Sequence, residues 1–209
     1  PEVGISNELT PDVAWTVYYH KILMTNIILD QLYTMNGTDM ERQDLAGEAY
    51  FMRAFSYFML ANLYGKPYHP ATANEDLCVP LNKEIGLSDK MMKRATNAAV
   101  YAQMEEDINK AIQCFKAIGG EKTIFRPNLP SAYLLASRIA LFQEKYDVTI
   151  LYCDSVFKVA TQPLYKLQEK KDHYFFSLAN KEILLSYGLT SLETHMKEDF
   201  RYTGNLVVS

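Results

Sequence analysis

Residues 45–65, LAGEAYFMRAFSYFMLANLYG, decide the fold, because they predict a helix that is buried on almost every side. Between residues 49 and 64, only Arg53, Ser56 and Asn62 are polar without being aromatic. The apolar positions therefore run around the helix instead of forming one stripe, as expected for a helix at the centre of a protein. Arg53 interrupts the apolar run, which favours a buried core helix over a membrane span.

The residues before this helix predict a first helical hairpin over residues 12–65. Apolar residues recur at helical spacing from residue 12 to about residue 35. Residues 39–43 are expected to form a short charged connection, which would make the two helices antiparallel neighbours. The central helix is expected to end on Gly65 in the left-handed conformation that glycine adopts easily.

A third, clearly amphipathic helix is predicted to begin at an N-cap, Thr96, and to stop at Gly119-Gly120. Its polar face is expected to lie in solvent and consists of Gln103, Glu105, Glu106, Asp107, Asn109, Lys110, Gln113 and Lys116. The consecutive carboxylates at residues 105–107 are interpreted as part of this solvated face and not as an acid/base pair.

A fourth and a fifth helix are predicted over residues 130–144 and 147–160. Five of their residues occupy positions at which a tetratricopeptide repeat places its aromatic, small and apolar packing residues. These are Tyr133, Ala136, Ser137, Tyr146 and Ile150. A second copy at a spacing of about 34 residues is not evident. The pattern therefore predicts stacked helical hairpins with one degenerate repeat.

Composition and motifs favour a binding protein or a scaffold over an enzyme. The chain has 209 residues, of which 48% are hydrophobic, and a net charge of −4 that gives no reason to expect nucleic acid as a partner. Its three cysteines are far apart and predict no disulfide framework. The four histidines are widely separated and no nucleophile or phosphate motif is present. We therefore expect no catalytic residues, no metal and no cofactor.

Two polar residues within apolar faces are expected to be structural. Arg53 is alone in a hydrophobic helix, and a buried charge is costly unless it is paired. Glu48 is five positions away and badly spaced for a pair on one helix face, so the partner is expected on another helix. Asn26 lies within the apolar face of the first helix and is likewise expected to make core hydrogen bonds.

The chain resembles the SusD/RagB family, surface-exposed nutrient-binding lipoproteins of Bacteroidetes. Residues 47–67, GEAYFMRAFSYFMLANLYGKP, look like the signature helix of that family. Further similar residues follow the family's order: Trp15, Tyr19, Ile22, Asn26 and Ile27 in the early helix, Arg94-Ala95-Thr96 before the next one, Tyr101, Ile108 and Ala111 within it, Ala132, Leu135, Ala136, Arg138, Leu141, Tyr146 and Asp147 in the repeat-like pair, and Glu182-Ile183 after it.

The resemblance implies an all-α fold of stacked helical hairpins, a TPR-like superhelix, with a little irregular or extended structure near the C-terminus. It implies one SusD-like helical domain over residues 1–209, made of a first hairpin (12–65), a long loop (66–93), further helices (94–162) and a partial C-terminal region (163–209). Members of the family are typically longer and begin with a lipoprotein signal. The chain is therefore expected to be a fragment or a truncated member.

The resemblance also implies a protein that is lipid-anchored on the outer face of the outer membrane and is not an enzyme. Such a protein would capture glycans for import through a TonB-dependent, SusC-like transporter. Two alternatives remain open within this interpretation. The ligand is a peptide or another nutrient, as in the RagB branch, or this helical part only docks the transporter and binds no small molecule itself.

Candidate ligand contacts come from the loop over residues 66–93, because a loop of this length in a compact domain is usually functional or disordered. Tyr64 and Tyr68 are candidate platforms on which sugar rings would stack. His69 and Asn74 are candidate hydrogen-bond partners for sugar hydroxyls. The competing interpretation is that the two tyrosines pack back on the domain.

Overall fold

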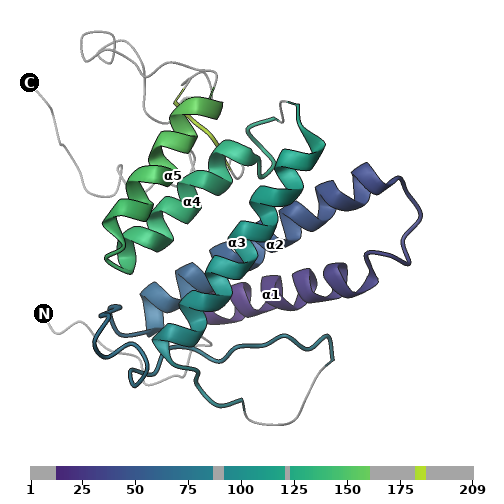
Figure 1. Cartoon of the computed structure of the whole chain (residues 1–209). Coiled ribbons are helices and arrows are strands. Elements are labelled where there is room, and N and C mark those ends of the chain that lie inside the picture. The colour runs from purple at the N-terminus through teal and green to yellow at the C-terminus, as the bar shows by residue number, and fades with distance from the viewer. Residues whose placement is uncertain (1–12, 87–91, 121–122, 161–181, 187–209) are drawn as a thin grey trace, which may run out of the picture.

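The computed structural model describes residues 13–86, 92–120, 123–160 and 182–186. These residues form five α-helices and no strand, which confirms the predicted all-α class (Figure 1). The helices are α1 (Val13–Gln31), α2 (Asp39–Tyr64), α3 (Asn97–Ile118), α4 (Leu129–Phe142) and α5 (Tyr146–Val159).

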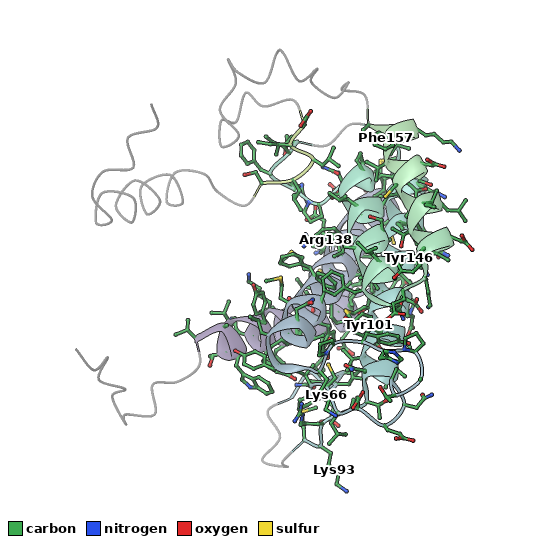
Figure 2. All side chains as sticks on the ribbon, turned by 90° about the vertical axis from the view of Figure 1, so that its left-hand side faces the viewer. Lys66, Lys93, Tyr101, Arg138, Tyr146 and Phe157 are labelled. Atoms are coloured by element: carbon green, nitrogen blue, oxygen red, sulfur yellow. The ribbon has the colours of Figure 1, made fainter. Side chains whose placement is uncertain are left out.

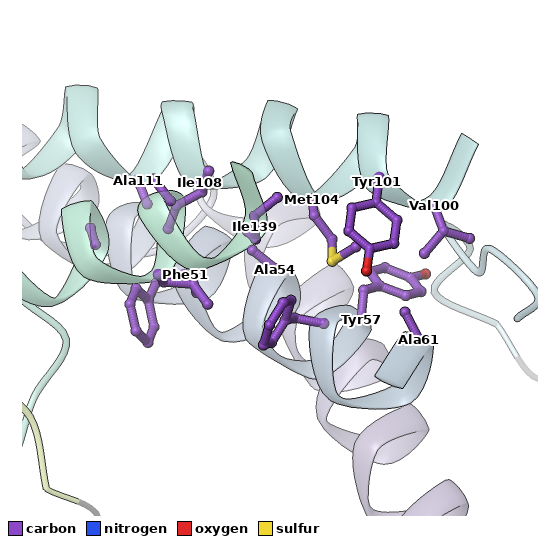
Figure 3. Packing of buried hydrophobic residues seen from close by; sticks show 14 of the residues in the cluster. Phe51, Ala54, Tyr57, Ala61, Val100, Tyr101, Met104, Ile108, Ala111 and Ile139 are labelled. Atoms are coloured by element: carbon purple, nitrogen blue, oxygen red, sulfur yellow. The ribbon is translucent and has the colours of Figure 1, made fainter. Parts of the chain in front are cut away.

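The helix α2 lies at the centre, as its apolar pattern predicts. It packs against α1 on one side and α3 on another, while α4 and α5 form a further hairpin that rests mainly on α3 (Figure 1). Figure 3 shows Tyr57 of α2 beside Tyr101 and Met104 of α3, with all three side chains in the space between the two helices. The helices therefore share one core.

Both ends of α2 differ from the sequence-based expectation. Residues 39–43 are not a connection but the first turn of α2, because Thr38 and Glu41 form a capping box that starts the helix earlier. Gly65 is extended, with φ −87° and ψ 162°, and not left-handed. Glycine is needed there for space, since a Cβ atom would lie 2.6 Å from the carbonyl oxygen of Ala61 and 2.8 Å from the sulfur of Cys78.

The helix α3 has the predicted ends but not the predicted polar face. The Thr96 side chain accepts a hydrogen bond from the first turn, and Gly119 ends the helix with φ 66°. Asp107, expected in solvent, is 0% exposed, and Gln103 is 5% exposed. Asp107 is buried because it is the charge partner of Arg53, a relation that helical spacing alone does not reveal.

The α4–α5 hairpin buries Tyr133, Ala136 and Ser137 at the predicted repeat-like positions. On α5, Tyr146 and Ile150 are 60% and 59% exposed, so they lie on the outer face of the pair. Figure 2 shows this helix with its labelled residues at one side of the molecule.

A short segment near the C-terminus, residues 182–186, is irregular, with a turn at Glu182 and a bend at Leu184. The amide of Ser186 donates to the carbonyl oxygen of Ile124 at 2.7 Å, and the Asn128 side chain donates to the carbonyl oxygen of Leu184 at 2.8 Å. The rest of the predicted C-terminal region lies outside the described residues. The division of the chain into one domain stays a prediction.

Candidate functional site

The four predicted ligand contacts lie at the C-terminal end of α2 and in the loop that follows it. Tyr64 is half-buried in the last turn of α2, where its ring meets the ring of Trp15 edge-to-face with 5.0 Å between centroids. Trp15 is the single tryptophan of the chain. One side of Tyr64 is therefore occupied by α1.

Tyr68 packs back on the helices, as the competing interpretation proposed. Its ring centroid lies 4.7 Å from that of Tyr101, a residue of α3 that is buried in the core. Burial raises the pKa of the Tyr101 hydroxyl to about 12. Because Tyr68 is only half-buried, part of its side chain still faces solvent.

His69 and Asn74 are both exposed. The Nδ1 atom of His69 accepts a hydrogen bond of 3.3 Å from the amide of Ala71, which orients the ring at the start of the turn over residues 70–75. Asn74 lies within that turn. The structure thus places the four residues along one short stretch, with Trp15 and Tyr101 as the aromatic neighbours of the two tyrosines.

An ion pair closes the base of this turn. The ammonium group of Lys66 lies 2.5 Å from a carboxylate oxygen of Asp76, and the hydroxyl of Thr72 donates to the other oxygen at 2.5 Å. The hydrogen bond from Lys66, followed by the one from Thr72, holds the pKa of Asp76 below its ordinary value. The ion pair therefore joins the two sides of the turn over residues 70–75.

The second part of the loop is fastened to the helices by buried side chains. The hydroxyl of Tyr57 donates to the carbonyl oxygen of Asn82 at 2.9 Å and accepts from the amide of the same residue at 2.9 Å. The hydroxyl of Tyr19 donates to the carbonyl oxygen of Pro80 at 2.8 Å. Burial raises the pKa of both phenols, that of Tyr57 to about 12. Residues 66–86 are therefore an anchored loop.

A charged cluster beneath the loop links three helices. The Arg53 guanidinium donates two hydrogen bonds to the carboxylate of Asp107, at 2.9 and 2.7 Å, and a third to the side-chain oxygen of Asn26 at 2.9 Å. The Asn26 amide donates in turn to the carbonyl oxygens of Asn82 and Glu84. Burial alone would lower the pKa of Arg53, but Asp107 outweighs it and the pKa is raised. The predicted structural roles of Arg53 and Asn26 are confirmed.

The contacts of Arg94 with the loop backbone are not predicted by the sequence. Arg94 donates to the carbonyl oxygens of Leu77 and Cys78 at the end of the turn and to that of Tyr64 at its beginning. The available signal was an arginine directly before a helix N-cap, Thr96, and after a long loop. Spacing along the sequence gives no indication of which carbonyl groups such a side chain reaches.

The described residues contain neither a cluster of metal ligands nor a helix that could span a membrane. No group of three or more histidine, cysteine or acidic side chains that could hold a metal ion occurs there. None of the helices in that part of the chain combines the length and the apolar character needed to cross a bilayer. The site consists of aromatic rings, hydrogen-bonding side chains and backbone groups, which suits a binding surface.

Residues 3–141 match a SusD-like family that is described as starch-binding and associating with the outer membrane. The chain belongs to this SusD-like family. The match covers the whole of α1 to α3, the loop between α2 and α3 and nearly all of α4. The predicted resemblance to SusD/RagB proteins is thereby confirmed. No curated protein matches the sequence.

Solved structures share the SusD-like fold. A SusD-like carbohydrate-binding protein from Bacteroides vulgatus matches with a TM-score of 0.71 at 22% identity, over 82% of this chain and 36% of that one. A SusD superfamily protein from Bacteroides thetaiotaomicron gives 0.68 at 25% identity, over 75% and 34%. A laminarin-binding SusD-like protein gives 0.61 at 25% identity, over 75% and 32%. The chain thus spans about a third of the length of these relatives.

Proposed function

We propose that this chain is the helical part of a cell-surface, lipid-anchored SusD-like protein that captures oligosaccharides for import through a TonB-dependent, SusC-like transporter. The single observation that carries the proposal is the family match over residues 3–141. A laminarin-binding protein among the solved relatives supports a glycan as the ligand class. In this proposal the chain binds and presents its ligand and performs no chemistry on it.

Within this part of the protein, we propose that the loop after α2 contributes ligand contacts. Tyr68 is only half-buried, so one part of its ring is free to lie against a sugar while Tyr101 supports the other. Exposed His69 and Asn74 follow on the same loop and offer hydrogen-bonding groups. Tyr64, held by Trp15, is the inner member of this set. The anchored loop supports a preformed surface.

Affinity electrophoresis of the whole chain in gels that contain laminarin or soluble starch tests this proposal. We expect retarded migration of the wild-type protein, and a loss of affinity of about fivefold, roughly 1 kcal/mol, for Tyr68→Ala. Tyr33→Ala is the matched control, because Tyr33 is 87% exposed and precedes α2 instead of following it. A folded wild-type chain that neither gel retards would contradict ligand binding by this part of the protein.

A second candidate function is a docking scaffold for the transporter, and the outer face of α5 favours it. Ile150, Leu151 and Phe157 are all more than half exposed on this helix. Apolar groups gathered on one face of a helix are typical of a surface that contacts another protein. Under this alternative, glycans would not bind this chain, and substitutions on α5 instead of the loop would weaken its association with the transporter.

A further inference from the structure

Within the connection between α2 and α3, the Arg94 side chain contacts both ends of the segment over residues 64–78. Arg94 donates through its Nη2 atom to the carbonyl oxygen of Tyr64 at 3.3 Å, where the loop begins. The same atom donates to the carbonyl oxygen of Leu77 at 3.0 Å, and Nε donates to that of Cys78, just after the turn over residues 70–75. One guanidinium therefore contacts both ends of the segment that carries Tyr68.

Arg94 also completes the C-terminus of α2. The last carbonyl groups of a helix have no partner within the helix, and they carry a partial negative charge that favours a cation. The last turn of α2 contains no basic residue, and Tyr64 is its final residue. The guanidinium of Arg94 supplies a donor and a positive charge at that end from a distant part of the chain.

The same loop completes the N-terminus of α3. The amides of Asn97 and Ala98, in the first turn of α3, donate to the carbonyl oxygens of Asp76 and Ala73 at 2.8 Å each. The Asn97 side chain, which is fully buried, donates to the carbonyl oxygen of Lys66 at 3.1 Å. The loop is therefore built against the ends of two helices, with Arg94 at their junction.

We propose that Arg94 is a positioning residue for the candidate ligand contacts. It holds residues 64–78, which carry them, in one conformation before a ligand binds. A loop that is already ordered loses less conformational entropy on binding, so affinity is higher than for a free loop. The effect of Arg94 on ligand affinity rests on the function proposed above. Its effect on the loop itself does not.

The chemistry of arginine is essential to this role. The planar guanidinium presents several donors in a fixed fork, and here two of its nitrogens reach three carbonyl oxygens on two separate segments. A lysine ammonium keeps the charge but is a compact group on a flexible stem, without a fork that spans the two segments. Arg94→Lys therefore keeps the positive charge but removes the forked set of donors, so it tests the hydrogen bonds apart from the charge.

Hydrogen exchange of the whole chain, comparing Arg94→Lys with the wild type, tests the effect on the loop. We expect the amides of Cys78, Asn97 and Ala98 to exchange about tenfold faster in the variant, with the midpoint of global unfolding little changed. Arg42→Lys is the control, because Arg42 lies near the other end of α2, roughly 30 Å away, and also donates to a backbone carbonyl group. Unchanged exchange in Arg94→Lys would overturn the proposal.

Calorimetric titration with laminarin tests the effect on the ligand. We expect the affinity of Arg94→Lys to fall about tenfold through a less favourable binding entropy at unchanged stoichiometry, which a merely structural role would not produce. Trp15 fluorescence reports the same titration, since its ring contacts Tyr64. Equal affinity of variant and wild type would overturn positioning. If the wild type binds no glycan, the proposed function fails and the exchange measurement alone decides whether Arg94 orders the loop.

Discussion

Arg53 shows how one buried charge organises its surroundings. Its guanidinium is bonded to Asp107 on α3 and to Asn26 on α1, and through Asn26 it reaches the loop backbone. Gln103 donates to the same carboxylate at 3.0 Å, so the negative charge has donors from two helices. A buried pair of this kind adds little net stability over an apolar pair, but breaking it is costly because one charge is left alone.

We predict that Arg53→Met lowers the free energy of unfolding by about 3–5 kcal/mol, because it leaves the fully buried Asp107 carboxylate without its charge partner. The double variant Arg53→Met/Asp107→Leu should recover most of this loss, since neither charge then remains. Urea denaturation followed by circular dichroism measures both values.

The control for this prediction is Glu106→Gln, which removes the partner of Lys110 in a pair that is about half exposed. We expect a change within about 0.5 kcal/mol, as for other surface pairs on one helix. A double variant no more stable than Arg53→Met would show that the cost comes from lost packing and not from the uncompensated charge.

At the scale of elements, α2 and α3 approach closely where α2 carries a glycine. A Cβ atom on Gly47 would lie 2.7 and 2.9 Å from two ring atoms of Phe115 and 3.1 Å from the Cβ of Cys114. Glycine costs about 1 kcal/mol relative to alanine within a helix. Its place in the middle of α2 is therefore explained by space for the ring of Phe115.

We predict that Gly47→Ala lowers the free energy of unfolding by about 1–3 kcal/mol, although alanine favours the helix, because the core must shift to admit the methyl group. The loss should shrink in a Phe115→Leu background, where the two ring atoms that lie nearest to the added methyl group are gone. Gly86→Ala is the control, since a Cβ atom there meets nothing within 4 Å. If Gly47→Ala raises stability as helix propensity alone predicts, the close approach is absent.

Sequence patterns predicted those elements whose causes are local. The apolar run of α2, the Thr96 cap and the glycines after α3 each depend on neighbouring residues, and the structure bears them out. The burial of Asp107 could not be predicted, because its partner Arg53 is 54 residues away. The loop over residues 66–93 was predicted from its length. The contacts of Arg94 could not be predicted, because the carbonyl groups that it reaches lie 16 to 30 residues away along the chain.

At the scale of the whole molecule, one helix face is apolar and exposed. Neighbouring residues on α5 differ sharply, since Val156 is 8% exposed and Phe157 is 62% exposed. Figure 2 places Phe157 at the opposite end of the molecule from Lys66, which is the first residue of the anchored loop. The two proposed roles, ligand binding and docking, would therefore use separate ends of this part of the protein. This part spans about a third of the length of its solved relatives.

We predict that Phe157→Ser changes the free energy of unfolding by no more than about 0.5 kcal/mol, because its side chain does not contribute to the core. The adjacent Val156→Ser should lower it by about 2 kcal/mol, since it removes buried methyl groups and buries a hydroxyl. Thermal and urea unfolding of the two variants measure the difference. Equal losses would mean that another part of the chain covers the outer face of α5, and the docking alternative would then lose its supporting observation.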